Sequence, residues 1–148
     1  MRNVRHLLEA KAPEIFSIGP DAPVIDAVRL MAERGIGALL VMDGAQLVGI
    51  LSERDYARKI VLQGRASTNT PVREIMTSDV ISVGCDDTID HCMQIVTDKR
   101  IRHLPVVRAG EVVGVVSIGD LVNWIIGAQN SAIHQLETYI TGYPTPPA

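Results

Sequence analysis

The chain has 148 residues, a formal net charge of −3 and a sequence pI near 5.7. This length fits one ordinary domain or two small halves that share a core. Hydrophobic residues make up 47% of the chain and aromatic residues only 3%, so we expect an aliphatic core. The mild acidity argues against broad binding to nucleic acid or to acidic membranes. The opening residues lack a signal-peptide pattern and no apolar run reaches about 18 residues, which predicts a soluble cytoplasmic protein.

Few residues in the chain suggest catalysis or metal binding. Cys85 and Cys92 lie seven residues apart, a spacing that fits no common metal or redox motif, and Cys92 falls on the apolar face of a predicted helix. His6, His91 and His134 have no partner at metal-ligand spacing, so we expect surface or capping roles. The sequence carries neither a glycine-rich phosphate loop nor a plausible nucleophile set. We therefore predict a protein that is not an enzyme and has no catalytic cofactor.

The first half of the chain contains a regular succession of predicted elements. A short strand is expected near residues 15–18, and Asp21 in the next turn can cap a following helix. That helix covers residues 23–35, where apolar side chains recur at helical spacing and a glycine supplies the stop. Two apolar strands joined by a turn at Asp43-Gly44 follow over residues 38–52, and then a second helix begins.

The second half repeats this succession at a constant offset of 65 residues. Residues 15–56 lie over residues 80–121 without a gap, and most aligned pairs keep their apolar or polar character. Similar lead-in segments, VRHLL at 4–8 and VREIM at 72–76, precede the two copies. A polar linker at 62–71 joins the halves. The predicted units are a first repeat at residues 1–65, a second repeat at 66–128, and a C-terminal helix with a flexible tail at 129–148.

A Ser-x-x-Asp sequence ends the last strand of each copy. Ser52 and Asp55 form the first one, and Ser117 and Asp120 form the second. One interpretation is structural, since this pattern is close to a helix capping box. The other is functional, since a carboxylate in the first turn of a helix can accept two hydrogen bonds from a vicinal diol. The occurrence of the pattern at the same place in both copies favours ligand binding by at least one of them.

These features resemble a tandem pair of cystathionine-beta-synthase (CBS) domains, often called a Bateman module. The resemblance is carried by residues 72–122 and, more weakly, by residues 4–56, so it covers nearly the whole chain. It implies an α/β (α+β) fold in which two β-α-β-β-α repeats pack sheet to sheet about a pseudo-two-fold axis. It also implies that adenine nucleotides bind in clefts between the two halves, with the Asp of the repeated motif on the ribose hydroxyls.

The resemblance further suggests which residues contact the other parts of a nucleotide. It implies phosphate contacts at Arg102 and His103, whereas Lys99 and Arg100 fit a solvated helix end, since cations favour helix C-termini. The first half has no charge at the positions that match Arg102 and His103, but two arginines lie in and after its Ser-x-x-Asp. The predicted nucleotide-binding residues are Ser52, Asp55, Ser117 and Asp120 near the ribose, Arg54, Arg58, Arg102 and His103 near the phosphates, and Ser17, Ala38, Thr77, Ser78, Val80 and Leu104 near the adenine, together with Ile118.

The sequence thus predicts a non-enzymatic adenine-nucleotide sensor that regulates a partner protein or its own assembly. AMP is the preferred ligand, with ATP, ADP and NAD as the other candidates. The alternative is a structural dimerisation or partner-binding module that takes no nucleotide, and a nucleotide hydrolase is the least supported class. The consecutive apolar residues Trp124, Ile125 and Ile126 indicate a homodimer. The tail helix, with Leu136 and Tyr139, either adds to that interface or folds back over this surface.

Overall fold

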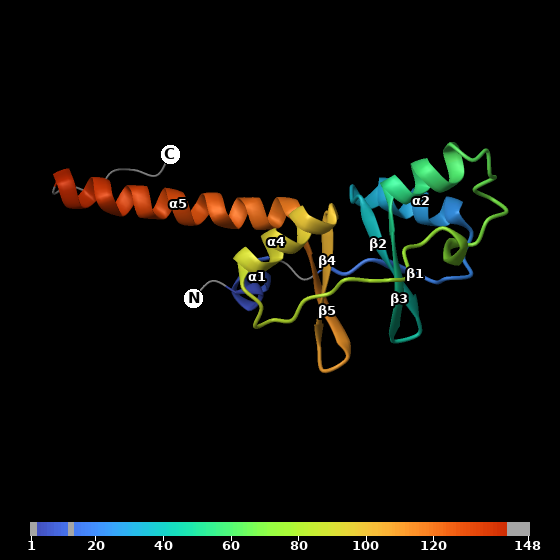
Figure 1. The fold of residues 1–148 in the computed structure, drawn as a ribbon, viewed down its shortest axis with the longest axis horizontal. Helices are drawn as coiled ribbons and strands as arrows, with labels where there is room; N and C mark the ends of the chain where they lie inside the picture. The colour runs from blue at the N-terminus through green and yellow to red at the C-terminus, as the bar shows by residue number, and fades with distance from the viewer. Residues whose placement is uncertain (1–2, 12–13, 142–148) are drawn as a thin grey trace.

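The computed structural model describes residues 3–11 and 14–141, and the predicted flexible tail at 142–148 lies outside the described residues. The two halves lie next to each other, each with its own hairpin, and the last helix extends from the second half (Figure 1). In chain order the elements are α1 (Val4–Ala10), β1 (Ser17–Ile18), α2 (Val24–Arg34), β2 (Ala38–Asp43), β3 (Gln46–Ser52), α3 (Glu53–Tyr56), the π-helical η1 (Ala57–Val61), the 3₁₀-helical η2 (Val72–Glu74), α4 (Ile89–Lys99), β4 (His103–Arg108), β5 (Glu111–Ser117) and α5 (Ile118–Thr141).

The predicted mixed α/β fold with an internal repeat is confirmed. In the first half β1 pairs parallel to β2, and β2 pairs antiparallel to β3; in the second half β4 and β5 form the matching hairpin. The turn predicted at Asp43-Gly44 is present, with Gly44 at a φ of 61°, a left-handed conformation that costs glycine little. Each hairpin carries an irregularity at the corresponding step, after Val41 and after Val106.

The first strand of the second repeat is shorter than predicted. The segment at 80–83 forms only one parallel bridge, from Val83 to Val106, in the register that Ile18 and Val41 have in the first half. The reason is Pro105. In the first half the amide of the corresponding residue, Leu40, donates to the carbonyl of Phe16 at 3.3 Å, but proline has no N–H to donate. The pairing therefore stops after one residue.

The two lead-in segments are exchanged between the halves. Val4 and Leu7 of α1 are buried in the core of the second half, whereas Val72 and Ile75, in and after η2, are buried in the core of the first. Each core therefore contains side chains that the sequence places at the start of the other repeat. Because removing either segment would expose buried aliphatic surface, the exchange couples the stability of the two halves.

Ion pairs accompany this exchange and correct one prediction. Asp21 does not cap α2, whose N-cap is Pro23 with no side-chain hydrogen bond; Asp21 pairs instead with Arg73 of η2. Arg5 of α1 forms the matching pair with Asp86 of the second half at 2.5 Å. In each half, therefore, the aspartate of the turn forms an ion pair with an arginine of the exchanged lead-in segment.

The C-terminal helix is one continuous element. Residues 118–141 form a single 24-residue α5, which extends beyond the body of the molecule (Figure 1). Its first turns pack on the core through Leu121, Trp124 and Ile125. The helix predicted after residue 129 is thereby confirmed. Over the described residues it runs away from the body, so the alternative in which the tail folds back is wrong.

Candidate functional site

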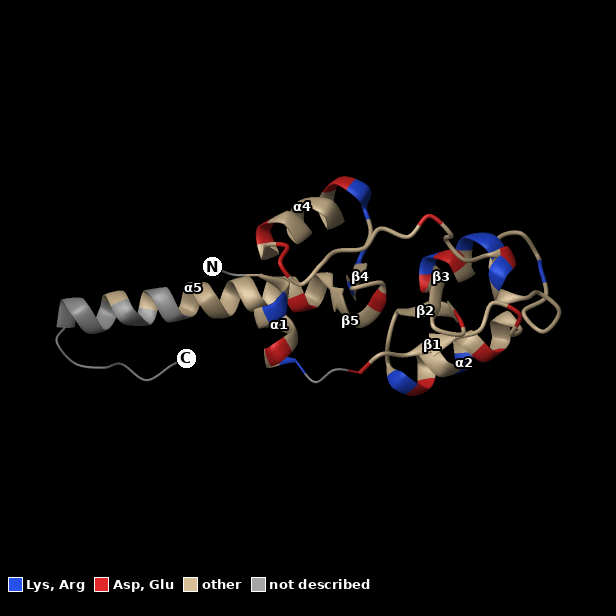
Figure 2. Ribbon diagram, turned by 90° about the horizontal axis from the view of Figure 1, so that it is seen from below, with Lys and Arg blue, Asp and Glu red and all other residues tan. Residues whose placement is uncertain are grey.

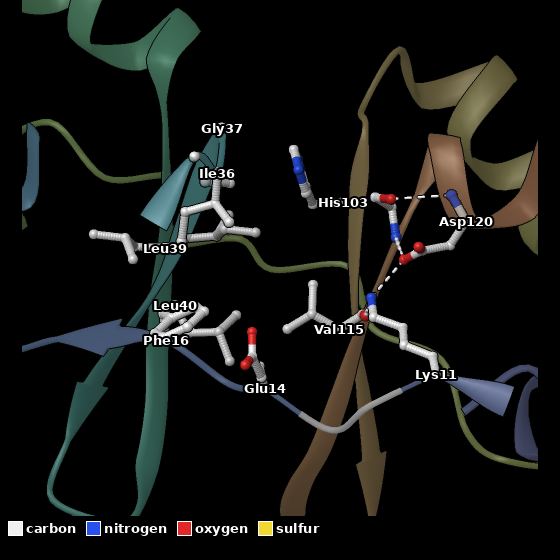
Figure 3. Close-up of a pocket in the computed structure, with 14 residues that line it drawn as sticks. Lys11, Glu14, Phe16, Ile36, Gly37, Leu39, Leu40, His103, Val115 and Asp120 are labelled. Carbon is white, nitrogen blue, oxygen red and sulfur yellow. Dashed lines mark hydrogen bonds and ion pairs between the residues drawn. The ribbon is translucent and has the colours of Figure 1, made fainter. Parts of the chain in front are cut away.

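Two clefts lie between the halves. The larger has a volume of about 800 Å³ and is bounded by the end of β3, by α3, by the segment at 77–81, and by the passage from α4 to β4. The smaller has a volume of about 310 Å³ and lies between the two hairpins, with Lys11, Glu14 and Phe16 on its rim (Figure 3). Gly37, Ala38, Ile50 and His103 line both clefts.

Asp55 lies on the wall of the larger cleft. β3 ends at Ser52, whose side chain caps α3, and Asp55 is the third residue of that helix. The Ser52 amide and hydroxyl both donate to Asp55 Oδ2 at 3.0 Å, and the Asp55 amide donates to Ser52 Oγ at 3.1 Å. Lys59, one turn later, pairs with Oδ1 at 3.2 Å. The capping-box interpretation is confirmed, and the box fixes the carboxylate at the cleft.

Asp120 occupies the corresponding place on the smaller cleft. The Ser117 amide donates to its Oδ2 at 2.9 Å, and Lys11 Nζ reaches the same oxygen at 2.5 Å (Figure 3). Burial alone would raise the pKa of Asp120. The hydrogen bonds from Lys11 and the Ser117 amide, together with the Lys11 charge, outweigh burial and hold this pKa below its usual value. The two copies of the motif thus share their capping geometry and differ in the cation that meets the carboxylate.

The larger cleft is rich in basic side chains from both halves. Five of them, Arg54, Arg58, Lys99, Arg100 and Arg102, line it together with the acidic Glu53, Asp55 and Asp79. In Figure 2 basic residues, coloured blue, occur on the helical segment beside β3 and at the end of α4. Within the described part of the chain none of the five forms an ion pair with a carboxylate. A cleft with this charge favours an anionic ligand.

Arg100 has a backbone conformation that favours glycine. It follows α4 with a φ of 55°, at the position where Gly35 follows α2 with a φ of 63°. A left-handed residue with a Cβ costs roughly 1–2 kcal/mol. The conformation keeps Arg100 on the cleft wall, where its carbonyl accepts a hydrogen bond from Arg54 at 2.9 Å. The interpretation of Lys99 and Arg100 as only a solvated helix end therefore overlooked their place on the cleft.

His103 lies between the two clefts. Its side chain projects from the start of β4 toward Gly37 of the other half, where an added Cβ would come within 3.7 Å of His103 Cε1 (Figure 3). Burial lowers its pKa below 6.5; Asp120 opposes the shift, while the charges of Lys11 and Arg102 add to it. The surroundings of His103 therefore favour the neutral imidazole.

The structure brings most of the predicted residues together, although it does not test what they bind. Nine of them line the larger cleft: Ala38, Ser52, Arg54, Asp55, Arg58, Thr77, Val80, Arg102 and His103. Ser117 and Asp120 line the smaller cleft, whereas Ser17, Ser78, Leu104 and Ile118 line neither. Leu104 is fully buried in the core of the second half.

Sequence reasoning missed several cleft residues. Lys11, Glu14 and Phe16 come to the smaller cleft from the segment that joins α1 to β1, and Asp79 comes to the larger cleft from the matching segment. The repeated lead-ins were the available signal, because equivalent segments of a two-copy fold occupy equivalent places. Elsewhere among the described residues, no three His, Cys, Asp or Glu side chains gather as metal ligands would, and none of the helices could cross a membrane.

The fold and its paired clefts define a tandem module made of two copies of one unit. The family model described as "CBS domain" matches residues 4–62 and 72–127. The chain therefore belongs to the CBS-domain family, and the resemblance predicted from sequence is confirmed.

Particular relatives agree with this assignment. The mitochondrial CBS domain-containing protein CBSX3 of Arabidopsis thaliana is 41% identical over 82% of this chain, which spans 62% of that protein's length. The structure of a putative signal-transduction protein with CBS domains from Burkholderia ambifaria matches with a TM-score of 0.83 and 48% identity, covering 86% of this chain and 96% of that one. The CBS domain pair of protein MJ0100, in complex with 5′-methylthioadenosine and S-adenosyl-L-methionine, matches with a TM-score of 0.76 and 27% identity, covering 86% of this chain and 98% of that one.

Proposed function

We propose that this CBS pair is a regulatory sensor that binds an adenine nucleotide, AMP by first choice, in the larger cleft. The observation that carries the proposal is one cleft that combines the carboxylate of Asp55, held by the Ser52 capping box, with five basic side chains that form no ion pair within the described part of the chain. A ribose diol can donate to the carboxylate, and the cations can meet the phosphate. The adenosine-containing ligands named for the MJ0100 pair support the ligand class.

We assign each part of the nucleotide to the residues of the larger cleft whose chemistry fits it. Asp55 and Thr77 lie beside each other, with Thr77 Oγ1 at 3.4 Å from Asp55 Oδ1, and form the polar end for the ribose. Arg54, Arg58 and Arg102 form the phosphate end. The apolar Val80 and Ile81 line the same cleft and offer a surface for the adenine ring, with the 77–81 backbone at its edge.

Isothermal titration calorimetry of the full chain with AMP, ADP, ATP and NAD tests this proposal. We expect heat of binding with at least one of them and the strongest binding with AMP. No binding of any adenine nucleotide at millimolar concentration would refute it. Incubation of ATP or NAD with the protein and magnesium tests the non-enzymatic part, for which we expect no turnover. The cytoplasmic location stays a prediction beside a relative that is named mitochondrial.

The second candidate function, dimerisation, rests on α5. Five exposed apolar residues, Ile118, Val122, Ile126, Ile133 and Leu136, follow one another along this helix. At 3.6 residues per turn they fall within an arc of about 80°, and no charged residue occurs from 121 to 135. Beyond its first turns this helix has few partners in the body, and an isolated helix of about 12–15 residues is marginal in water. We call these five residues the α5 stripe. A homodimer that buries the stripe would remove its apolar side chains from water and would give the outer part of α5 a packing partner. The stripes carry no charge, so two copies do not repel each other there.

The two candidates are compatible with each other, since the stripe and the larger cleft share no residues. A nucleotide that changes how the two halves pack against each other would then change the dimer, or the surface that a regulated partner protein contacts. In the purely structural alternative the protein forms the dimer but binds no nucleotide. The titration described above separates the two.

A further inference from the structure

The two clefts differ in what meets the carboxylate of the repeated motif. In the smaller cleft Lys11 Nζ donates to Asp120 Oδ2 at 2.5 Å and to the Val115 carbonyl at 2.8 Å. Lys11 is itself a lining residue of that cleft, as Asp120 is, and the two lie side by side (Figure 3). Two partners hold the ammonium in place across 104 and 109 residues of sequence.

Among the residues that the structure describes, no lysine or arginine lining the larger cleft forms an ion pair with its carboxylate, Asp55. Lys59 pairs with Asp55, but it comes from η1, directly after α3, also donates to the Ile75 carbonyl at 2.9 Å, and does not line the cleft. The lead-in position that matches Lys11 at an offset of 68 residues is Asp79, which carries the opposite charge. The lysine that pairs with Asp55 therefore does not line the larger cleft, whereas the lysine that pairs with Asp120 lines the smaller cleft.

We infer that Lys11 occupies, in the smaller cleft, the place at the carboxylate that ligand hydroxyls take in the larger one, and so restricts each chain to a single adenine nucleotide. This inference rests on the proposed function. A ribose diol that bridges both carboxylate oxygens of Asp120 would have to displace Lys11 from Oδ2, where donor and acceptor are both charged. Lys11 is thus a specificity-determining residue, because it determines which of two clefts built from the same repeat binds the nucleotide.

The charge of the smaller cleft adds a second consequence. Its charged lining residues are Lys11, Glu14 and Asp120, so removing Lys11 leaves two carboxylates and no permanent cation. A phosphate group would be repelled there. The apolar lining from Phe16, Leu39 and Leu40 would remain. We therefore expect a chain without the Lys11 charge to accept the neutral nucleoside adenosine in this cleft, and AMP still only in the larger cleft.

Calorimetry on full-length chains tests this with AMP and adenosine as probes. Wild type should bind one AMP per chain, and AMP-saturated wild type should give no heat with adenosine up to millimolar concentration. AMP-saturated Lys11→Met should bind one adenosine per chain. The matched control is Arg5→Met, which removes the ion pair between α1 and Asp86 and lines neither cleft; it should behave as wild type.

Lys11→Gln provides a second variant if Lys11→Met does not fold, because its amide can still donate to the Val115 carbonyl. Two AMP molecules per wild-type chain would overturn the inference and leave the proposed function intact. The same holds if both Lys11 variants bind AMP and still refuse adenosine. If wild type binds no adenine nucleotide at all, the proposed function fails and this inference fails with it.

Discussion

Met76 lies directly against Gly49, so that a Cβ on Gly49 would come within 2.5 Å of the Met76 sulfur and 3.1 Å of the Thr77 carbonyl oxygen. The same relationship recurs in the other half, where a Cβ on Gly114 would meet Leu8 at 2.8 Å. Each lead-in segment thus packs on a glycine in the last strand of the hairpin that it joins. The exchange of segments depends on the absence of a side chain at these two glycines.

Gly49→Ala should therefore destabilise the protein by about 1–3 kcal/mol, since overpacking forces the segment outward. Gly114→Ala should cost less, because only the flexible end of Leu8 has to move. Gly19→Ala is the matched control, with nothing within 4 Å of its added Cβ. Urea denaturation of the three variants measures the free energy of unfolding. Equal stability of Gly49→Ala and Gly19→Ala would contradict the packing described above.

Asp55→Ala should weaken AMP binding by about 10-fold to 100-fold, the value of hydrogen bonds to a charged group of roughly 1.5–3 kcal/mol. Asp120→Ala should leave the affinity for AMP within about threefold of wild type, because Asp120 faces Lys11 in the other cleft. Titration calorimetry at one salt concentration compares them. A larger loss in Asp120→Ala than in Asp55→Ala would assign the nucleotide to the smaller cleft.

Arg100→Gly should raise the free energy of unfolding by about 0.5–1 kcal/mol and at the same time weaken AMP binding. The gain arises because glycine adopts the φ of 55° without steric strain, and the loss arises because a cation leaves the cleft wall. Denaturation and calorimetry on one preparation measure both effects. The affinity for adenosine, which has no phosphate, is the internal control and should not change. Stabilisation without any loss of AMP affinity would show that the Arg100 side chain does not contribute to phosphate binding.

His103 should make the protein less stable as the pH falls below 6.5. Its folded-state pKa is lowered from 6.5, so between that lower value and 6.5 the unfolded chain binds more protons than the folded chain. The free energy of unfolding therefore decreases with falling pH across this window. His103→Gln should show a smaller decrease between pH 7.5 and pH 5.5 in urea denaturation. An identical decrease in both proteins would show that other groups cause it.

The α5 stripe should control the association of two copies. Ile133→Glu should shift the protein toward a 16.1 kDa monomer in sedimentation equilibrium, because it places a charge in the apolar stripe. Asn130→Glu adds the same charge off the stripe and should stay dimeric. Gln129 lies on the arc of the stripe, so Gln129→Leu should tighten the dimer. A wild-type monomer at micromolar concentration, or a dimer unaffected by Ile133→Glu, would refute this interface.

The sequence alone determined the repeat, the two hairpins and the doubled Ser-x-x-Asp, because these depend on contacts between neighbours in the chain. Ser52 caps its own helix three residues before Asp55, and Gly35 ends α2 through its own backbone. Such features are local, so residue order and spacing are sufficient to predict them. The length of the first strand in the second repeat could not be predicted in this way. The missing N–H of Pro105 shortens that strand only because the segment at 80–83 lies beside it, and local spacing does not indicate this neighbour.

The tertiary structure decided everything that joins distant segments. Nothing in the order of residues indicates that Val4 belongs to the core of the second half, or that Asp21 pairs with Arg73 instead of capping α2. The contact of Lys11 with Asp120 spans 109 residues, and it distinguishes two carboxylates that are equivalent in sequence. Local patterns predict what each copy of a repeat can form, but the packing of one copy on the other determines which charges meet in each cleft.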